Sequence, residues 1–71
     1  MTAQRQIEIR GDMIRLGQLL KVAGIVDSGG MIKPFLATET VLVNGEPEAR
    51  RGRQLHVGDV VETAGQTLRL V

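Results

Sequence analysis

The spacing of the apolar residues changes twice along this chain, and these changes limit the folds that it can adopt. Residues 6–10 alternate apolar and charged side chains, which is typical of a half-buried strand whose Ile7 and Ile9 face inward. From Met13 onward, apolar residues instead recur at the spacing of one helical face: Leu16, Leu19, Leu20 and Ala23. Asp12 is placed to cap the first turn of that helix. We therefore expect a strand followed by an amphipathic helix.

A second helix is expected after residue 26, because Asp27 or Ser28 can cap its first turn. Its apolar face has three members at helical spacing: Ile32, Phe35 and Leu36. Proline is tolerated in the first turn of a helix but costs about 3 kcal/mol further along. This helix therefore either begins near Met31 or is kinked at Pro34.

Turn-forming residues divide the second half of the chain into short strands. Residues 41–43 predict a strand, and Asn44-Gly45 is typical of a tight type I′ turn. Pro47 restricts the returning segment to an edge strand or a loop. A terminal hairpin is predicted from two strands and the turn between them: residues 60–63, 64–65 and 66–71. The chain, residues 1–71, is thus expected to be a single α+β domain, with two short helices packed on a small, mostly antiparallel sheet.

The composition excludes several classes of protein. The chain has 71 residues, a net charge of +1 and no cysteine, which removes disulfides and thiolate metal sites. No apolar run approaches the ~20 residues of a membrane-spanning helix, and residues 1–6 do not form a signal peptide. His56 is the only histidine, so neither a metal site nor a catalytic constellation is expected. We expect a cytoplasmic protein that is not an enzyme, carries no cofactor or metal, and contacts no membrane.

Three arginines are the leading candidates for ligand binding. Arg50, Arg51 and Arg53 place three guanidinium groups within four residues, and each can grip phosphate oxygens with a fork of donors. The alternative is a solvated loop whose charge is partly neutralised by the preceding Glu46 and Glu48. A net charge of +1 does not by itself predict nucleic-acid binding. Any prediction of such binding must therefore rest on where the positive charges lie in the folded protein.

Four other residues are further candidates. Lys33 lies in the first turns of the second helix, beside the glycine amides of residues 29–30, where a phosphate could approach; the alternative is an ordinary surface lysine. Arg15 and Lys21 both face solvent on the first helix but point in directions about 120° apart. Asn44 is first of all a turn residue, with a ligand contact as the second interpretation.

Four motifs occur in a fixed order between residues 15 and 62. They are Arg15-Leu16-x-x-Leu19-Leu20, Ser28, Val41-x-Val43-Asn44-Gly45 and Leu55-x-Val57-Gly58-Asp59-x-Val61. On these residues the chain resembles the RNA-binding domain named after protein four of the small ribosomal subunit (the αL motif), especially its small stand-alone bacterial branch. The chain departs from the usual family pattern at four positions on or near the helices. Gly17 replaces a common acidic residue, Gly29 replaces an arginine, Ile32 replaces a small residue, and Glu39 replaces the glycine that usually precedes the next strand.

The resemblance implies a non-enzymatic protein of the αL-motif fold that binds structured RNA. This RNA is expected to be ribosomal or tRNA-like, and a ribosomal particle could supply further contacts. A monomer is expected. The candidate RNA-binding residues are Arg15, Lys21, Lys33, Asn44, Arg50, Arg51 and Arg53. Because Phe35 is the only aromatic residue, selectivity is expected from RNA shape and 2′-hydroxyl contacts rather than from base stacking.

The main alternative is a protein–protein adaptor on the same fold, with little or no RNA affinity of its own. Its contact would be an exposed strand edge at residues 41–43 or 67–71, extended by an added strand. A third possibility is a domain that keeps the fold and has lost RNA affinity, as Gly29 and the eight acidic residues would allow.

Overall fold

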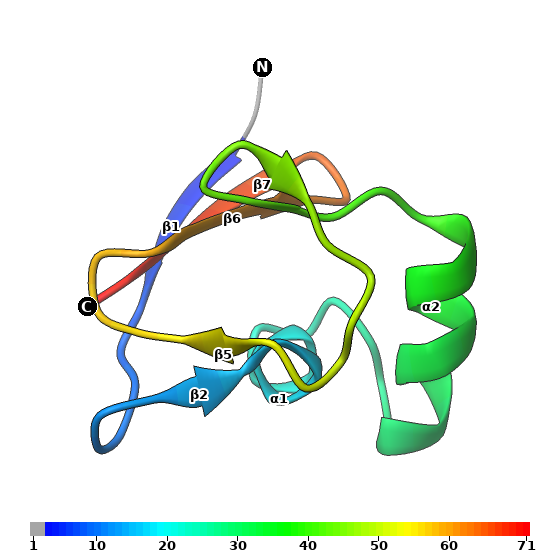
Figure 1. The fold of residues 1–71 in the computed structure, drawn as a ribbon, viewed down its shortest axis with the longest axis horizontal. Coiled ribbons are helices and arrows are strands. Elements are labelled where there is room, and N and C mark those ends of the chain that lie inside the picture. Colours follow the sequence, from blue (N-terminus) through cyan, green and yellow to red (C-terminus); the bar gives the residue numbers. More distant parts are fainter. Residues whose placement is uncertain (1–2) are drawn as a thin grey trace.

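The computed structural model describes residues 3–71, in which short strands flank two short helices (Figure 1). In chain order the elements are β1 (Ala3–Ile7), β2 (Ile14–Arg15), α1 (Leu16–Val22), the 3-10 turn η1 (Gly29–Met31), α2 (Ile32–Thr38), β3 (Leu42–Val43), β4 (Glu46–Pro47), β5 (Gln54–Leu55), β6 (Val60–Thr63) and β7 (Gln66–Leu70). The predicted α+β class is confirmed. Neither helix within residues 3–71 has the length and apolar character needed to cross a bilayer.

Five of the strands form one sheet in the order β1-β7-β6-β3-β4, and β2 pairs with β5 in a separate two-stranded ribbon. Neighbouring strands run antiparallel except β1 and β7, which are parallel, so the mostly antiparallel sheet is confirmed. The first strand covers residues 3–7 rather than 6–10. The adaptor edges expected at residues 41–43 and 67–71 are wrong, because β3 and β7 each have a paired strand on both sides.

The core lies between the large sheet and the layer formed by α1, α2 and the β2–β5 ribbon (Figure 1). Leu16, Leu19 and Leu20 of α1 are completely buried, which confirms the apolar stripe expected for this helix. Fully burying a leucine contributes about 1.5–3 kcal/mol, so this stripe is a large share of what fixes α1 to the sheet. Ile7 and Ile9 are buried as predicted, and the half-buried Phe35 packs against the same core.

The helix α1 begins at Leu16, after β2, and the cap expected from Asp12 is wrong. The first-turn amides are satisfied from a distant part of the chain instead. The Leu16 N–H donates to the Arg53 carbonyl, and the Gly17 N–H donates to the Arg51 carbonyl, each at 2.9 Å. Backbone carbonyls therefore replace the side-chain cap that helix N-termini usually require.

The helix α2 begins at Ile32, directly after η1, so Pro34 lies in its first turn and the first of the two expected arrangements is correct. Ser28 occupies the N-cap position of η1 but makes no side-chain capping hydrogen bond. The Met31 N–H donates to the Ser28 carbonyl at 3.1 Å. Backbone hydrogen bonding within η1 thus prepares the start of α2.

Two tight turns join the hairpins as predicted. Asn44 and Gly45 have φ values of 52° and 85°, and the Ala64-Gly65 pair has 51° and 71°. Positive φ at both central positions is what a type I′ turn requires. Pro47 lies on β4, the edge strand of the large sheet, where its missing N–H leaves no gap in a ladder.

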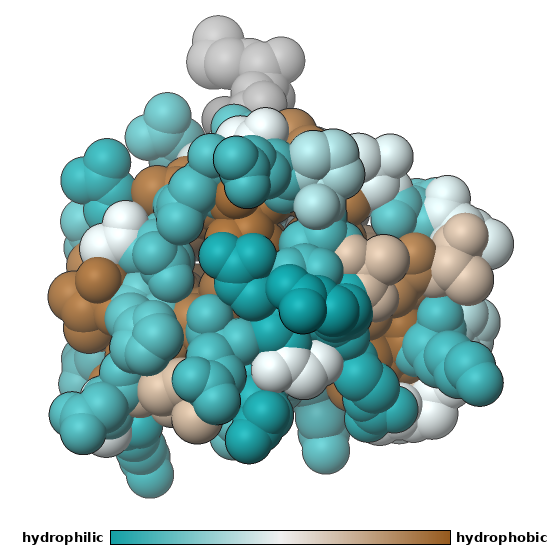
Figure 2. Space-filling view, in the orientation of Figure 1, coloured by the Kyte–Doolittle hydropathy of each residue, from teal (hydrophilic) through white to brown (hydrophobic). Residues whose placement is uncertain are grey.

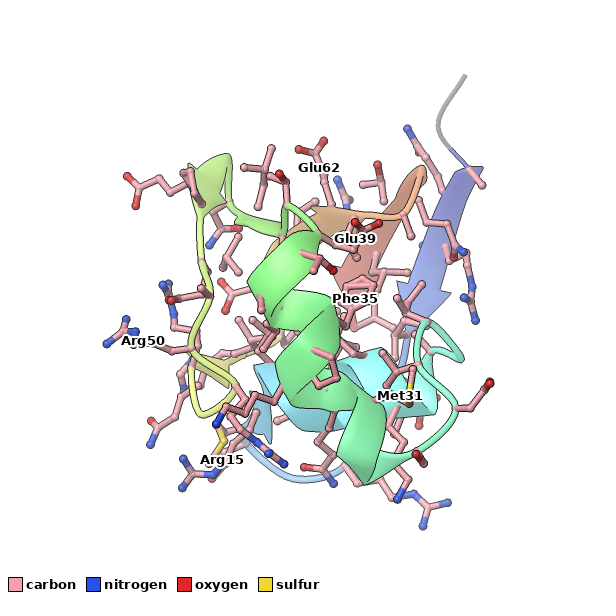
Figure 3. The ribbon with its side chains drawn as sticks, turned by 90° about the vertical axis from the view of Figure 1, so that its right-hand side faces the viewer. Arg15, Met31, Phe35, Glu39, Arg50 and Glu62 are labelled. Carbon is pink, nitrogen blue, oxygen red and sulfur yellow. The ribbon has the colours of Figure 1, made fainter. Side chains whose placement is uncertain are left out.

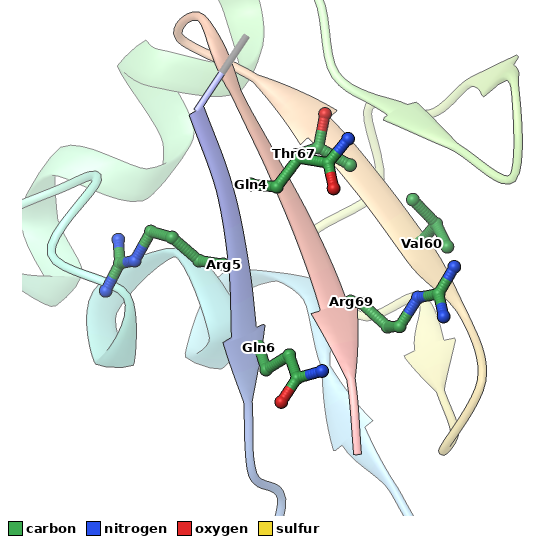
Figure 4. A pocket seen from close by; sticks show the side chains of 6 residues that line it. All are labelled: Gln4, Arg5, Gln6, Val60, Thr67 and Arg69. Atoms are coloured by element: carbon green, nitrogen blue, oxygen red, sulfur yellow. The ribbon is translucent and has the colours of Figure 1, made fainter.

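The outer face of the large sheet carries mostly polar side chains where β1, β6 and β7 lie side by side. A shallow hollow there is lined by side chains of β1, β6 and β7, among them Gln4, Gln6, Val60, Thr67 and Arg69 (Figure 4). Figure 2 shows that hydrophilic side chains also gather over the segment that links β4 to β5. This segment carries the three neighbouring arginines.

Candidate nucleic-acid interface

The segment of residues 49–53, named here the basic loop, runs along the N-terminal end of α1. Its carbonyls at Arg51 and Arg53 accept the first amides of the helix, and the Arg53 N–H donates to the Arg50 carbonyl at 3.2 Å within the loop. The Glu48 N–H, just before the loop, donates to the Val41 carbonyl at 2.8 Å. The loop backbone is therefore fixed to the helix on one side and to the sheet on the other.

Glu48 is the anchor of the basic loop. Its side chain is only 8% exposed, and it forms ion pairs with Arg50 at 3.1 Å and Arg53 at 2.9 Å. Its Oε2 atom also accepts hydrogen bonds from the amides of Ala49 and Arg50, at 3.1 and 3.2 Å. The Arg50 guanidinium above all, and then that of Arg53, lowers the pKa of Glu48 to about 2. The same contact raises the pKa of Arg50.

The pairing of Arg50 with Glu48 uses both atoms of one guanidinium edge. Nε donates to Oε2 and Nη2 donates to Oε1, each at 3.1 Å. This is the side-on fork that arginine otherwise presents to a phosphate. Figure 3 shows Arg50 projecting outward from the loop, and its side chain is 76% exposed. Arg50 therefore keeps an exposed outer edge, while its inner edge is occupied.

Arg51 differs from its two neighbours. It is exposed, and within residues 3–71 its side chain has neither an ion pair nor a hydrogen bond. It lines a groove together with Lys21 of α1, Gly29 of η1 and Arg15, which lies in β2 directly before α1 and not on the helix as expected. Arg51 also lines a second hollow beside Lys33 of α2. The predicted cations Arg15, Lys21, Lys33 and Arg51 are thus brought around one part of the surface.

The groove beside α1, named here the α1 groove, has no carboxylate in its lining. Its lining residues are Arg15, Gly17, Gln18, Lys21, Gly29, Ile32, Arg51 and Gly52. Arg15 is oriented by a hydrogen bond from its Nη1 atom to the Gly52 carbonyl at 3.2 Å. Because glycines supply part of the lining, backbone is accessible between the cations. Such a surface favours an anion whose oxygens can accept several hydrogen bonds.

Asn44 has a structural role that uses both the nitrogen and the oxygen of its side-chain amide. Nδ2 donates to Asp59 Oδ1 at 3.1 Å, and Oδ1 accepts the Val60 N–H at 2.9 Å. The other carboxylate oxygen of Asp59 accepts the His56 N–H at 2.8 Å, and this hydrogen bond is the main reason that the pKa of Asp59 is lowered. Asn44 therefore links the β3–β4 turn to the turn before β6.

The sequence identifies the basic residues, but it does not show which of them are paired with an acid and which are free to bind a ligand. It gives Glu48 only as one of two neutralising acids, together with Glu46. Within residues 3–71 the ion pairs are those of Glu48 alone, and Glu46 has none. The signal in the sequence is the position of Glu48, two residues before Arg50 and five before Arg53. Nothing in the sequence indicates that Gly17 lines the groove.

The fold and this site define a small α+β domain whose cations gather where a helix meets a loop. The S4 domain family model matches residues 7–71, so the chain belongs to the S4 domain family, as the motifs between residues 15 and 62 indicated. A similar protein is the "Probable ribosome maturation protein RlbA" of Bacillus subtilis (strain 168). The two are 59% identical over 59 residues, which cover 83% of this chain and 83% of the relative.

Proposed function

We propose that this chain is a small, monomeric, non-enzymatic protein of the cytoplasm that binds structured RNA through the α1 groove and the adjoining Lys33. The observation that carries this proposal is the convergence of Arg15, Lys21 and Arg51 on one groove without a lining carboxylate. Arg51 is far along the chain from Arg15 of β2 and Lys21 of α1, so the fold rather than local composition concentrates their charge.

The groove would bind RNA mainly through its phosphates. The guanidinium groups of Arg15 and Arg51 supply forks of donors, and Lys21 and Lys33 supply mobile point charges. Phe35 packs against the core, so it offers no stacking platform, and the sequence has no tryptophan or tyrosine. Selectivity then depends on the spacing of phosphates and 2′-hydroxyls in a folded RNA.

The relative's name connects it with ribosome maturation, which supports ribosomal RNA, or a ribosomal particle, as the partner of this chain. A tRNA-like RNA is the alternative partner that the family resemblance implies. The protein would act by binding alone, through the contacts of its cations with the phosphates of the RNA.

The test is binding of a fluorescently labelled RNA hairpin, compared with a DNA duplex of matched sequence, at several salt concentrations. We expect tighter RNA binding, which weakens steeply as salt rises because phosphate contacts release counterions. Arg51→Gln should weaken binding and reduce the salt slope by about 1. Arg69→Gln is the matched control, because it removes the same charge from the outer face of the sheet.

The absence of RNA binding by the native protein at low salt would overturn the proposal. Equal losses in the Arg51→Gln and Arg69→Gln variants would show that binding depends on overall charge and not on the α1 groove.

A further inference from the structure

We infer that Glu48 determines which arginines of the basic loop are available to RNA, by retaining Arg50 and Arg53 as structural partners and leaving Arg51 to contact phosphate. This inference rests on the proposed RNA-binding function and assigns Glu48 as a positioning and specificity-determining residue. The inference changes the set of residues expected to contact RNA, because the three neighbouring arginines then do not make three equivalent contacts.

The first argument is the occupancy of the arginine forks. Arg50 already donates from Nε and Nη2 to the two oxygens of Glu48, and Arg53 donates from Nη1 to Oε1 at 2.9 Å. A phosphate that drew either arginine away from Glu48 would leave a nearly buried carboxylate with fewer partners. Breaking such a pair by removing one member is costly, because the remaining charge is left uncompensated. Arg51 can meet a phosphate without this cost.

The second argument is the position of Arg51 between the two anchored residues. Glu48 fixes the Arg50 amide through a hydrogen bond of 3.2 Å, and it fixes the Arg53 side chain through the ion pair. Between them, the Arg51 carbonyl accepts the Gly17 N–H of α1. The backbone is therefore held before, at and after Arg51, which directs its side chain to the α1 groove beside Arg15.

The third argument is charge. The α1 groove is lined by three cations and no acid, whereas the hollow lined by Arg50 and Arg53 adjoins the carboxylate that both residues contact. Three positive charges and one negative charge share the segment from Glu48 to Arg53. The partner favoured by this division is a phosphodiester that lies along α1 rather than one that wraps the outside of the loop.

The test compares salt slopes of hairpin binding in five proteins: the native chain, Arg50→Gln, Arg51→Gln, Glu48→Gln and the double variant Glu48→Gln/Arg50→Gln. We expect Arg51→Gln to reduce the slope by about 1 and Arg50→Gln to reduce it by less than half as much. With Glu48 neutralised, Arg50 is released, so Glu48→Gln should steepen the slope. Arg50→Gln should then reduce the slope by about 1 in the Glu48→Gln background.

Equal losses of salt slope for Arg50→Gln and Arg51→Gln in the native background would overturn the inference. This comparison tests the inference even if Glu48→Gln does not fold, because neither variant contains that substitution. An effect of Arg50→Gln that is the same in the native background and in the Glu48→Gln background would also overturn it. Both results require that the native protein binds RNA. If the native protein binds no RNA at low salt, the proposed function itself is overturned.

Discussion

Gly17 of α1 and Ile32 of α2 meet where the two helices pack together, and the missing side chain of Gly17 makes this approach possible. A Cβ atom on Gly17 would lie 3.2 Å from Ile32 Cγ2 and 3.4 Å from the Arg51 Cβ. The two departures from the family pattern noted in the sequence, a glycine in the first helix and a larger residue in the second, therefore compensate for each other.

We expect Gly17→Ala to destabilise the protein by about 1 kcal/mol, because crowding costs about 1–3 kcal/mol and exceeds the gain in helix propensity of about 1 kcal/mol. Ile32→Ala should cost less in the Gly17→Ala background than alone, with a coupling of at least ~0.5 kcal/mol. Urea unfolding followed by far-ultraviolet circular dichroism measures both, since the chain has no tryptophan or tyrosine. Strictly additive effects would contradict the contact.

Glu48 should make the stability of the protein sensitive to acid. Its pKa falls from the usual 4.5 to about 2 on folding, so its ion pairs contribute fully above pH 4.5 and the contribution is lost between about pH 4.5 and pH 2. The difference in unfolding free energy between the native protein and Glu48→Gln should therefore shrink as the pH falls through this window. Urea titrations at several pH values test this. The control is Glu46→Gln, which removes an acid that has no ion pair within residues 3–71.

Asn44→Ala should destabilise the fold by about 3 kcal/mol, since it loses two side-chain hydrogen bonds of about 1 kcal/mol each and places alanine at a positive φ, which costs about 1 kcal/mol more. Asn44→Gly keeps the turn conformation and should recover part of the loss. At temperatures where both variants are folded, the salt slope of RNA binding should equal that of the native protein. A reduced slope would show that Asn44 contacts RNA after all.

Arg5 should stabilise the junction between β1 and the end of α1. Its Nη1 atom donates to the Ala23 carbonyl at 2.8 Å and to Gln66 Oε1 at 3.0 Å, which places a positive charge at the C-terminal end of the helix. Arg5→Gln should cost about 1 kcal/mol in urea unfolding. The control is Arg10→Gln, which removes an exposed charge outside any element. Equal stabilities of the two variants would contradict this role.

Features encoded by neighbouring residues were predictable, and features made by distant backbone were not. The Leu16, Leu19 and Leu20 stripe and the Asn44-Gly45 turn follow from spacing and from φ preferences, which are local. The parallel pairing of β1 with β7 and the small β2–β5 ribbon join segments that are far apart in sequence. Two-residue strands carry almost no periodicity, so the sequence pattern around β2 indicates the start of a helix instead.

The candidate site shows the same limit. The cations could be named from sequence, because their charge is a property of the residue itself. Their partners could not, because the contact of Glu48 with two arginines and the hydrogen bond of Arg15 to a loop carbonyl depend on the path of the backbone. Carbonyl groups occur at every residue, so the sequence holds no mark of which ones will cap α1.

The capping of α1 by the carbonyls of Arg51 and Arg53 also sets an order of events during synthesis. A growing chain that ends before residue 51 lacks both acceptors for the first turn of its own helix. The groove is therefore complete only when the loop lies against the start of α1, because Arg51 and Gly52 of the loop belong to its lining. A ligand that binds only the completed groove would draw the folding equilibrium of the nascent chain toward the native state.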